Sequence, residues 1–179
     1  MNIIGLTGSK FHGKDTVADL IQKYGTNRVV RLSFAEPIKK ALSVIHVIPY
    51  NYFDDPKLKE LPLPQWGGRT PRQLAQWFGT DIYRNQFDRE IWLKNMLMRI
   101  EKYNSENCTI VITDCRFDNE IEFVRNIGGV IWKVDASLRV PPSGDSHESE
   151  NGVSVTTDVT IDNNGSYREL EELVKSQLF

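Results

Sequence analysis

The sequence lacks the features that would assign the protein to a membrane or to a nucleic acid. With 22 Lys and Arg against 24 Asp and Glu its formal net charge is -2, so it has no basic excess for binding nucleic acid or anionic lipid. No apolar run reaches transmembrane length, and residues 1–20 have neither the basic start nor the apolar segment of a secretion signal. We therefore expect a cytoplasmic protein that binds neither nucleic acid nor membrane.

Cysteine and histidine are also scarce. The two cysteines, Cys108 and Cys115, are not spaced as a Cys-x-x-Cys redox or metal motif, and His147 has no second histidine nearby in the sequence. The sequence therefore indicates a reduced protein without a histidine-based metal site. Cys115 precedes an arginine, which could lower its thiol pKa, but a buried and unreactive thiol is the better interpretation.

The pattern that is present is an alternation of strands and helices. At 179 residues, with 40% hydrophobic residues, the chain has the size of a single domain with a substantial core. Such an alternation predicts the α/β class, with a parallel sheet and helices on both of its faces. The predicted strands span residues 3–7, 29–34, 109–113, 130–134 and 159–161.

The sequence is organised around residues 8–16, which follow the apolar run 3–6 and precede a helical pattern. Strand, glycine loop and helix together identify a Gly-x-x-x-x-Gly-Lys match as a phosphate-binding loop. Glycines let backbone N–H groups curl around phosphate oxygens, the helix N-terminus attracts the anion, and Lys14 adds positive charge for the β- and γ-phosphates. Asp15 stands where Ser or Thr usually holds magnesium, and Thr16 follows one position later. The sequence leaves open which of them contacts the metal.

A second group of candidate residues follows the predicted strand 109–113. Ligands gather at the carboxyl ends of strands in parallel sheets, so we expect Asp114 beside the phosphates, holding magnesium directly or through water. Arg116, at the same rim, can bind a phosphate or stabilise a transferring phosphoryl group. Pairing of Arg116 with Glu120 is compatible with that function, because a carboxylate can hold an arginine in place.

The segment between these two groups, residues 36–104, is predicted to be a helical substrate-binding region. Its stretch 47–68 contains several prolines and glycines and no helical period, so we expect an irregular excursion there. Thr70 and Gln73 have the spacing of a capping box at the start of the next helix. Residues 139–152 are polar and aperiodic, and are expected to form a lid-like loop.

Arginines and aromatic residues in this region suggest a second binding site. A kinase must bring two substrates together, and three arginines near one helix suit a second anion: Arg69, Arg72 and Arg84. Lys10, inside the glycine loop, could bridge both phosphates. Trp77 and Phe78 have the spacing of core residues, whereas Trp92 lies off the main apolar stripe, where it could be core or could stack on a base.

Several separated motifs make the chain resemble the deoxynucleoside monophosphate kinases of tailed bacteriophages. The Gly-Lys-Asp-Thr form of the loop is one that this family uses. The resemblance covers most of the chain and is specific because the motifs occur together in one order. The motifs are residues 13–19, 35–39, 72–81, 87–89 with Trp92, 114–116 with Asp118 and Glu120, 146–150 and 161–166.

The resemblance implies the fold of a P-loop nucleoside monophosphate kinase. This fold is a three-layer sandwich formed by a single domain over residues 1–179, with a five-stranded parallel sheet and the loop on its central strand. The implied reaction transfers the γ-phosphoryl group of ATP to a deoxynucleoside monophosphate, with magnesium. Lys14, Asp114 and Arg116 are the implied catalytic residues.

The resemblance also implies three sets of ligand contacts. The ATP-binding residues are Phe11, His12, Gly13, Lys14, Asp15 and Thr16. The residues on or near the acceptor nucleotide are Lys10, Ile38, Lys39, Arg72, Gly79, Thr80, Trp92, Asp114, Arg116 and Glu120. The magnesium ligands are drawn from Asp15, Thr16 and Asp114.

Two alternatives to this function stay open from the sequence. The first is a P-loop kinase for another small phosphorylated acceptor, such as phosphomevalonate or dephospho-coenzyme A, because the glycine loop and Asp-x-Arg look alike there. The second is a nucleotide-dependent switch that only binds ATP. The sequence determines neither the accepted bases nor the oligomeric state, although it is compatible with a homodimer. If the protein is encoded by a phage, we expect it in the cytoplasm of the host cell.

Overall fold

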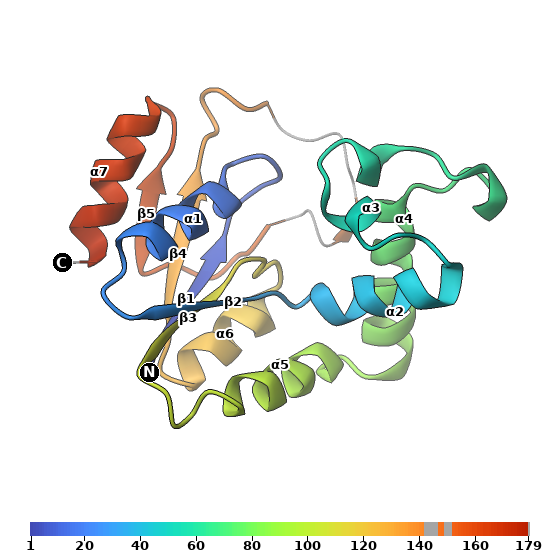
Figure 1. Ribbon diagram of the computed structural model, residues 1–179, viewed down its shortest axis with the longest axis horizontal. Helices are drawn as coiled ribbons and strands as arrows, with labels where there is room; N and C mark the ends of the chain where they lie inside the picture. The colour runs from blue at the N-terminus through green and yellow to red at the C-terminus, as the bar shows by residue number, and fades with distance from the viewer. Residues whose placement is uncertain (142–146, 149–151, 179) are drawn as a thin grey trace. The chain divides into compact units, whose positions relative to one another are not determined.

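The computed structural model describes residues 1–141, 147–148 and 152–178, and the chain divides into two compact units. Unit 1 comprises Met1–Ser33 and Met96–Phe179, and unit 2 comprises Phe34–Asn95. Unit 1 contains the β-sheet, whereas unit 2 is built of helices and turns (Figure 1). Much of the predicted lid-like loop, residues 142–146 and 149–151, lies outside the described residues.

The sheet of unit 1 has five parallel strands in the order β2-β3-β1-β4-β5 (Figure 1). The strands are β1 (Asn2–Thr7), β2 (Arg28–Leu32), β3 (Cys108–Ile112), β4 (Val130–Asp135) and β5 (Val159–Asp162). The predicted α/β class and five-stranded parallel sheet are confirmed, and the glycine loop follows β1, the central strand. Because the strands are parallel, their carboxyl ends lie at one edge, where the loop after β1 meets the residues after β3.

Helices cover both faces of this sheet because the side chains of a strand alternate between its two faces. Ile4 and Leu6 of β1 belong to a buried cluster with residues of α1 (Lys14–Tyr24) and α7 (Tyr167–Leu178). Gly5 points the other way, toward α6 (Asp118–Asn126): a Cβ atom there would lie 3.4 Å from Cγ1 of Val124. The absence of a side chain at Gly5 thus lets α6 pack closely on β1.

Unit 2 has its own core. Its elements are α2 (Glu36–His46), α3 (Asn51–Asp54), η1 (Leu58–Glu60), η2 (Pro64–Trp66), α4 (Pro71–Gln76), η3 (Trp77–Phe87) and the start of α5 (Ile91–Glu101). Its buried residues are Ile38, Leu42, Ile48, Phe53, Leu63 and Leu74. The predicted irregular excursion 47–68 contains three short helices, and half of these core residues come from it, so it packs as part of the core of unit 2.

The helix α4 begins with the predicted capping box and continues into η3, a π-helix that the sequence did not predict. The Thr70 hydroxyl accepts from the Gln73 N–H at 3.2 Å, and the Gln73 side chain accepts from the Thr70 N–H at 2.9 Å, which confirms the capping box. The chain then continues as η3, an 11-residue π-helix, a rare form that often occurs at functional sites. The prediction that Trp77 is buried is wrong: it is 41% exposed, with the Arg69 guanidinium 5.7 Å from its ring centroid.

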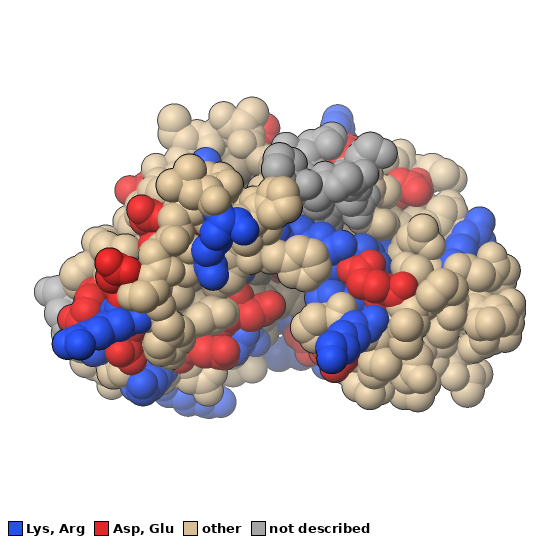
Figure 2. Space-filling view, turned by 90° about the horizontal axis from the view of Figure 1, so that it is seen from above, with Lys and Arg blue, Asp and Glu red and all other residues tan. Residues whose placement is uncertain are grey.

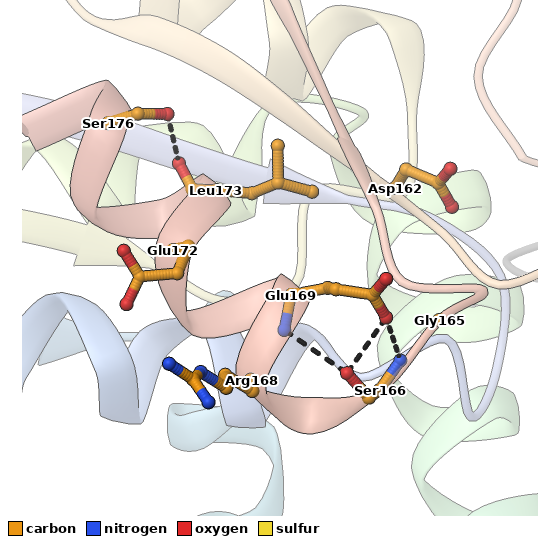
Figure 3. Close-up of a pocket in the computed structure, with 8 residues that line it drawn as sticks. All are labelled: Asp162, Gly165, Ser166, Arg168, Glu169, Glu172, Leu173 and Ser176. Atoms are coloured by element: carbon orange, nitrogen blue, oxygen red, sulfur yellow. Dashed lines mark hydrogen bonds between the residues drawn. The ribbon is translucent and has the colours of Figure 1, made fainter.

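The last helix, α7, begins at a polar cap. The Ser166 hydroxyl accepts from the Glu169 N–H at 3.3 Å, while the Glu169 carboxylate accepts from the Ser166 N–H at 2.6 Å (Figure 3). These bonds satisfy amides that have no partner within the helix. Across the described ranges, the helices are too short or too polar to cross a membrane.

Candidate functional site

The glycine loop is shaped by two residues that only glycine suits. Gly8 and Gly13 have φ angles of +137° and +94°, and a Cβ atom on Gly8 would collide with the Val134 carbonyl oxygen of β4. Lys14, the first residue of α1, folds back over the loop: its Nζ donates to the carbonyl oxygens of Gly8 at 2.6 Å and of Ser9 at 2.9 Å. The ammonium group and the N-terminus of α1 therefore face the same loop, as a phosphate site requires.

The middle of the loop is anchored to the ends of β4 and β5. His12 is buried, and its Nδ1 accepts a hydrogen bond from the Ala136 N–H at 3.1 Å. The His12 carbonyl accepts from the side-chain amide of Asn163 at 2.8 Å. His12 was predicted only as part of the ATP site; its ring serves to tie the loop to the sheet edge.

Lys10 and Phe11 lie next to each other in the glycine loop, with Phe11 exposed. The Lys10 ammonium lies 5.1 Å from the centroid of the Phe11 ring, and Phe11 is 59% exposed. Phe11 also has a φ of +67°, a left-handed conformation that costs free energy for a residue with a Cβ atom. Strained residues of this kind cluster at ligand-binding loops.

The segment after β3 is held beside the start of the glycine loop. The Thr113 N–H donates to the Leu32 carbonyl of β2, and the Cys115 N–H donates to the Leu6 carbonyl of β1, both at 3.0 Å. These alternating bonds continue the sheet past the end of β3. Asp114 lies between them, half-buried, at the strand edge from which the loop leaves β1.

Charged residues of both segments act on one buried thiol. Burial raises the pKa of Cys115 well above its usual range, the carboxylates of Glu120 and Asp114 raise it further, and the Lys14 ammonium opposes them. Lys14 of the glycine loop and the carboxylates of Asp114 and Glu120 after β3 thus all act on the Cys115 thiol. The structure therefore brings together the two groups of residues that the sequence placed far apart.

Glu120 fixes the turn that leads from β3 into α6. It is 3% exposed, and its Oε2 accepts from the backbone N–H groups of Arg116 at 2.7 Å and Phe117 at 3.1 Å. Both amides come just before α6, which begins at Asp118, so they have no partner within the helix. A buried carboxylate thus holds the backbone of Arg116 in place at the rim.

The three candidate magnesium ligands have different surroundings. Asp15 is exposed, and its Oδ1 lies 3.5 Å from Nη2 of Arg31, which also pairs with Asp19. Thr16 is half-buried, and its hydroxyl lies near Gly13. No group of three or more His, Cys, Asp or Glu residues in the described part of the chain is arranged as a metal cage. Magnesium commonly binds one or two protein oxygens together with substrate phosphates, and this oxygen-donor set fits that pattern.

Four of the predicted acceptor residues lie together in unit 2. The indole N–H of Trp92 donates to the Gly79 carbonyl at 2.8 Å, and a Cβ atom on Gly79 would lie 2.5 Å from Cδ1 of Ile38. Thr80, next to Gly79, is buried, and Tyr83 packs against Trp92 with ring centroids 5.7 Å apart. The π-helix η3 thus packs against both α2 and the start of α5, and the residues that make these contacts are ones predicted to bind the acceptor.

Two cations predicted at the acceptor pair with carboxylates of the 47–68 excursion. Lys39 Nζ lies 2.6 Å from Asp54 Oδ1, and Arg72 Nε donates to Glu60 Oε1 at 2.8 Å. On the face that Figure 2 displays, basic and acidic side chains are likewise interspersed. Sequence reasoning missed Asp54 and Glu60, because they lie in a stretch without periodicity that offers no signal of what it contacts.

The three arginines predicted as a second anion site have three different surroundings. Arg69 lies over Trp77, Arg72 pairs with a carboxylate, and Arg84 is 6% exposed, with its Nη1 donating to the Arg89 carbonyl at 3.3 Å. Arg84 is therefore a buried structural residue of η3. Arg72 combines partial burial with an ionic partner, Glu60.

The described part of unit 1 also has an open groove beside α7. It has a volume of about 670 Å³, and its lining consists of Asp162, Gly165, Ser166, Arg168, Glu169, Glu172, Leu173 and Ser176 (Figure 3). None of these residues belongs to the predicted site. Ser166 and Glu169 are already engaged in capping α7, and the groove carries three carboxylates, which disfavour a phosphate ligand.

The predicted site residues thus form two groups, one in each unit. The group in unit 1 contains Lys10, Phe11, His12, Gly13, Lys14, Asp15, Thr16, Asp114, Arg116 and Glu120. The group in unit 2 contains Ile38, Lys39, Arg72, Gly79, Thr80 and Trp92.

A family model and a similar viral protein both match this chain, and they carry the same description. The family model described as Deoxynucleotide monophosphate kinase matches residues 66–174. A putative deoxynucleotide monophosphate kinase of Acanthamoeba polyphaga mimivirus is 33% identical over 166 residues, which cover 84% of this chain and 81% of that protein.

Two phage proteins and one solved structure are also similar. The deoxynucleotide monophosphate kinases of Enterobacteria phage T4 and Escherichia phage RB69 are each 34% identical, over 64% and 60% of this chain. The matches span 46% and 44% of those two proteins, so this chain aligns with less than half of either. A gluconokinase from Sinorhizobium meliloti 1021 superposes with a TM-score of 0.48 at 13% identity, covering 99% of this chain and 91% of its own.

Proposed function

Because this chain belongs to the deoxynucleotide monophosphate kinase family, we propose that it transfers the γ-phosphoryl group of ATP to a deoxynucleoside 5′-monophosphate, giving the diphosphate and ADP. The observation that carries this proposal is the hydrogen bond from the Cys115 N–H to the Leu6 carbonyl at 3.0 Å, which holds the segment of Asp114 beside the end of β1, where the loop of Lys14 begins. A lysine on a glycine loop and an aspartate after the neighbouring strand are the two parts that P-loop kinases use to bind a nucleotide triphosphate.

On the donor side, the backbone amides of residues 11–16 and the Lys14 ammonium bind the phosphates of ATP. Asp114 would hold magnesium together with Thr16 or Asp15, and magnesium would supply neutralisation of charge on the phosphates. The position of Arg31 beside Asp15 favours Thr16, because it gives the Asp15 carboxylate a cationic partner already.

On the acceptor side, Arg72 binds the monophosphate and Glu60 orients its guanidinium through Nε. Ile38, Gly79, Thr80 and Trp92 contact the nucleoside. Arg116 stabilises the charge that develops on the transferring phosphoryl group. The reaction needs no covalent enzyme intermediate, because positioning and charge neutralisation do most of the work in phosphoryl transfer.

A panel of acceptors tests this function. The purified protein is incubated with ATP and magnesium and with each of the four common deoxynucleoside monophosphates, phosphomevalonate or dephospho-coenzyme A, and ADP release is followed in a coupled assay. We expect ADP release only with one or more deoxynucleoside monophosphates. Release with either of the other acceptors alone would assign the protein to a different kinase, and ATP binding without acceptor-dependent release would assign it to a switch.

Lys14→Ala provides the matched control for this panel. We expect it to lower turnover by at least about a hundredfold, because the charge on the transferred phosphoryl group loses its fixed counter-charge. Circular dichroism and the thermal unfolding midpoint should show a folded protein, since the Lys14 ammonium donates to carbonyl oxygens of the loop and is not part of the hydrophobic core. A folded Lys14→Ala protein with wild-type turnover would contradict the assignment of this loop to ATP.

A further inference from the structure

The turn between β5 and α7 places one buried side chain against the glycine loop. Asn163 is 4% exposed, and its Nδ2 donates to the His12 carbonyl at 2.8 Å. Its own backbone is held on both sides, because its N–H donates to the Asp135 carbonyl at 2.6 Å and its carbonyl accepts from Arg139 Nε at 2.5 Å. The side-chain amide is therefore presented to the loop from a fixed platform.

The hydrogen bond from Asn163 constrains the peptide group between His12 and Gly13. A trans peptide group is planar, and its C=O and N–H bonds point in opposite directions. Holding the His12 carbonyl toward Asn163 consequently aims the Gly13 N–H away from Asn163, where it is free of that side chain and can meet a ligand of the loop. Gly13, at a φ of +94°, has no side chain, and its backbone therefore has alternative conformations close in energy. The loop consequently needs an external constraint at this peptide group.

A second contact shows that Asn163 and Gly13 are fitted to each other. A Cβ atom on Gly13 would collide with Nδ2 of Asn163. The side-chain amide thus occupies the space that any other residue at position 13 would fill, and the loop backbone lies directly against it.

We infer that Asn163 is a positioning residue for nucleotide binding: it orients the His12–Gly13 peptide so that the Gly13 N–H meets a phosphate of the donor nucleotide. The inference rests on the proposed function, since it takes this loop to bind ATP. Asn163 itself touches no phosphate; it acts through the backbone of the loop.

The test compares Asn163→Ala and Asn163→Leu with Asn164→Ala. Leu has the same number and branching of side-chain heavy atoms as Asn but no donor or acceptor, so Asn163→Leu removes the hydrogen bond while filling the site. Asn164 lies in the same turn, but its side chain accepts from the Leu138 N–H at 2.8 Å and makes its other bonds to Asp162 and Asp135, so it is the matched control. The dissociation constant of magnesium AMP-PNP is measured by calorimetry, along with KM for ATP, KM for the acceptor and the thermal midpoint.

We expect Asn163→Ala and Asn163→Leu to weaken AMP-PNP binding about tenfold, the effect of losing one buried hydrogen bond. KM for ATP should rise by a similar factor while KM for the deoxynucleoside monophosphate stays within about twofold, and Asn164→Ala should bind AMP-PNP like the wild type. If Asn163 contributed only to stability, the Asn163 variants and Asn164→Ala could all have a lower thermal midpoint, but their dissociation constants for AMP-PNP would not differ from one another.

Two results overturn the inference. One is wild-type AMP-PNP affinity in a folded Asn163→Leu protein, and the other is equal weakening by Asn163→Ala and Asn164→Ala. If neither Asn163 variant folds, NMR is used to follow the Gly13 amide resonance of the wild type and of Asn164→Ala, with and without AMP-PNP. If AMP-PNP shifts that resonance in neither protein, the inference is overturned as well. Failure of the proposed function looks different, because the wild-type protein would then release no ADP with any deoxynucleoside monophosphate, whatever the Asn163 variants do to AMP-PNP affinity.

Discussion

Cys115 lies between Asp114 and Arg116 on the segment that carries the proposed chemistry, yet it is 1% exposed. The thiolate is the reactive form of cysteine, and an apolar environment disfavours it. Burial, followed by the charges of Glu120 and Asp114, raises the pKa of this thiol, so at neutral pH it stays protonated despite the nearby lysine. Its function at this position is to fill the space beneath Gly5, from whose Cβ position its Sγ lies 3.1 Å away.

We therefore predict that Cys115 resists alkylation. In the folded protein at pH 8, iodoacetamide should modify Cys115 much more slowly than it modifies a free cysteine, because the pKa shift lowers the thiolate fraction and burial blocks access. Peptide mass spectrometry measures the rate at this position. Denatured protein is the control and should react at both of its cysteines. Rapid modification of Cys115 in the folded protein would show that the segment after β3 opens to solvent.

At the scale of secondary-structure elements, the notable feature of unit 2 is the close contact of η3 with α2. Gly79 permits it, since its hydrogen atom faces the Ile38 side chain and its carbonyl accepts from Trp92. A π-helix is wider and less stable than an α-helix, so η3 depends on such packing to keep its form. The residues that hold η3 in place are also those proposed to contact the acceptor nucleoside.

Replacing Gly79 with Ala should consequently disturb the acceptor site more than the donor site. The new methyl group would lie 2.5 Å from Cδ1 of Ile38, and we expect a loss of about 1 kcal/mol in the free energy of unfolding, small because Cδ1 is a terminal atom. KM for the deoxynucleoside monophosphate should rise while KM for ATP changes little. Denaturant unfolding and steady-state kinetics measure the two effects.

The double variant Gly79→Ala with Ile38→Val tests the proposed contact. Ile38→Val deletes Cδ1, the atom that the alanine methyl would meet, and alone should cost about 1 kcal/mol. Because the two changes compensate, the double variant should lose less stability than the sum of the single variants. Strict additivity would show that η3 and α2 do not meet at this point.

At the scale of the whole molecule, the proposed donor residues and most of the proposed acceptor residues belong to different units. Unit 1 is an α/β sandwich that presents the glycine loop, and unit 2 is a helical unit with a core of its own. This division suits the proposed reaction with two substrates, because each unit has its own core and would hold one of them.

Hydrogen exchange measured by mass spectrometry should show that the donor and the acceptor nucleotide protect different segments of the chain. AMP-PNP is expected to slow amide exchange in residues 8–16 and 113–117, where backbone amides and α-helix termini face the phosphates. A deoxynucleoside monophosphate is expected to slow exchange mainly in residues 71–92. The Lys14→Ala protein serves as the control and should lose the first effect while keeping the second. Protection of residues 71–92 by AMP-PNP alone would contradict the division of the two sites.

The sequence by itself determined the class of the fold and the place of the glycine loop that is proposed as the donor site. Strand and helix periodicities are local, so they can be read from neighbouring residues, and the glycine loop carries its chemistry within nine positions. The edge after β3 followed from the rule that parallel strands end together. These elements needed no knowledge of which residues meet across the chain.

Only the tertiary structure decided how the site residues are held. Asn163 contacts His12 across 151 positions, Glu60 pairs with Arg72 from an aperiodic stretch, and Trp77 lies exposed despite its core-like spacing. Such pairs leave no pattern in the sequence, because a hydrogen bond needs only one donor and one acceptor, and folding alone determines which of the many candidates come within reach.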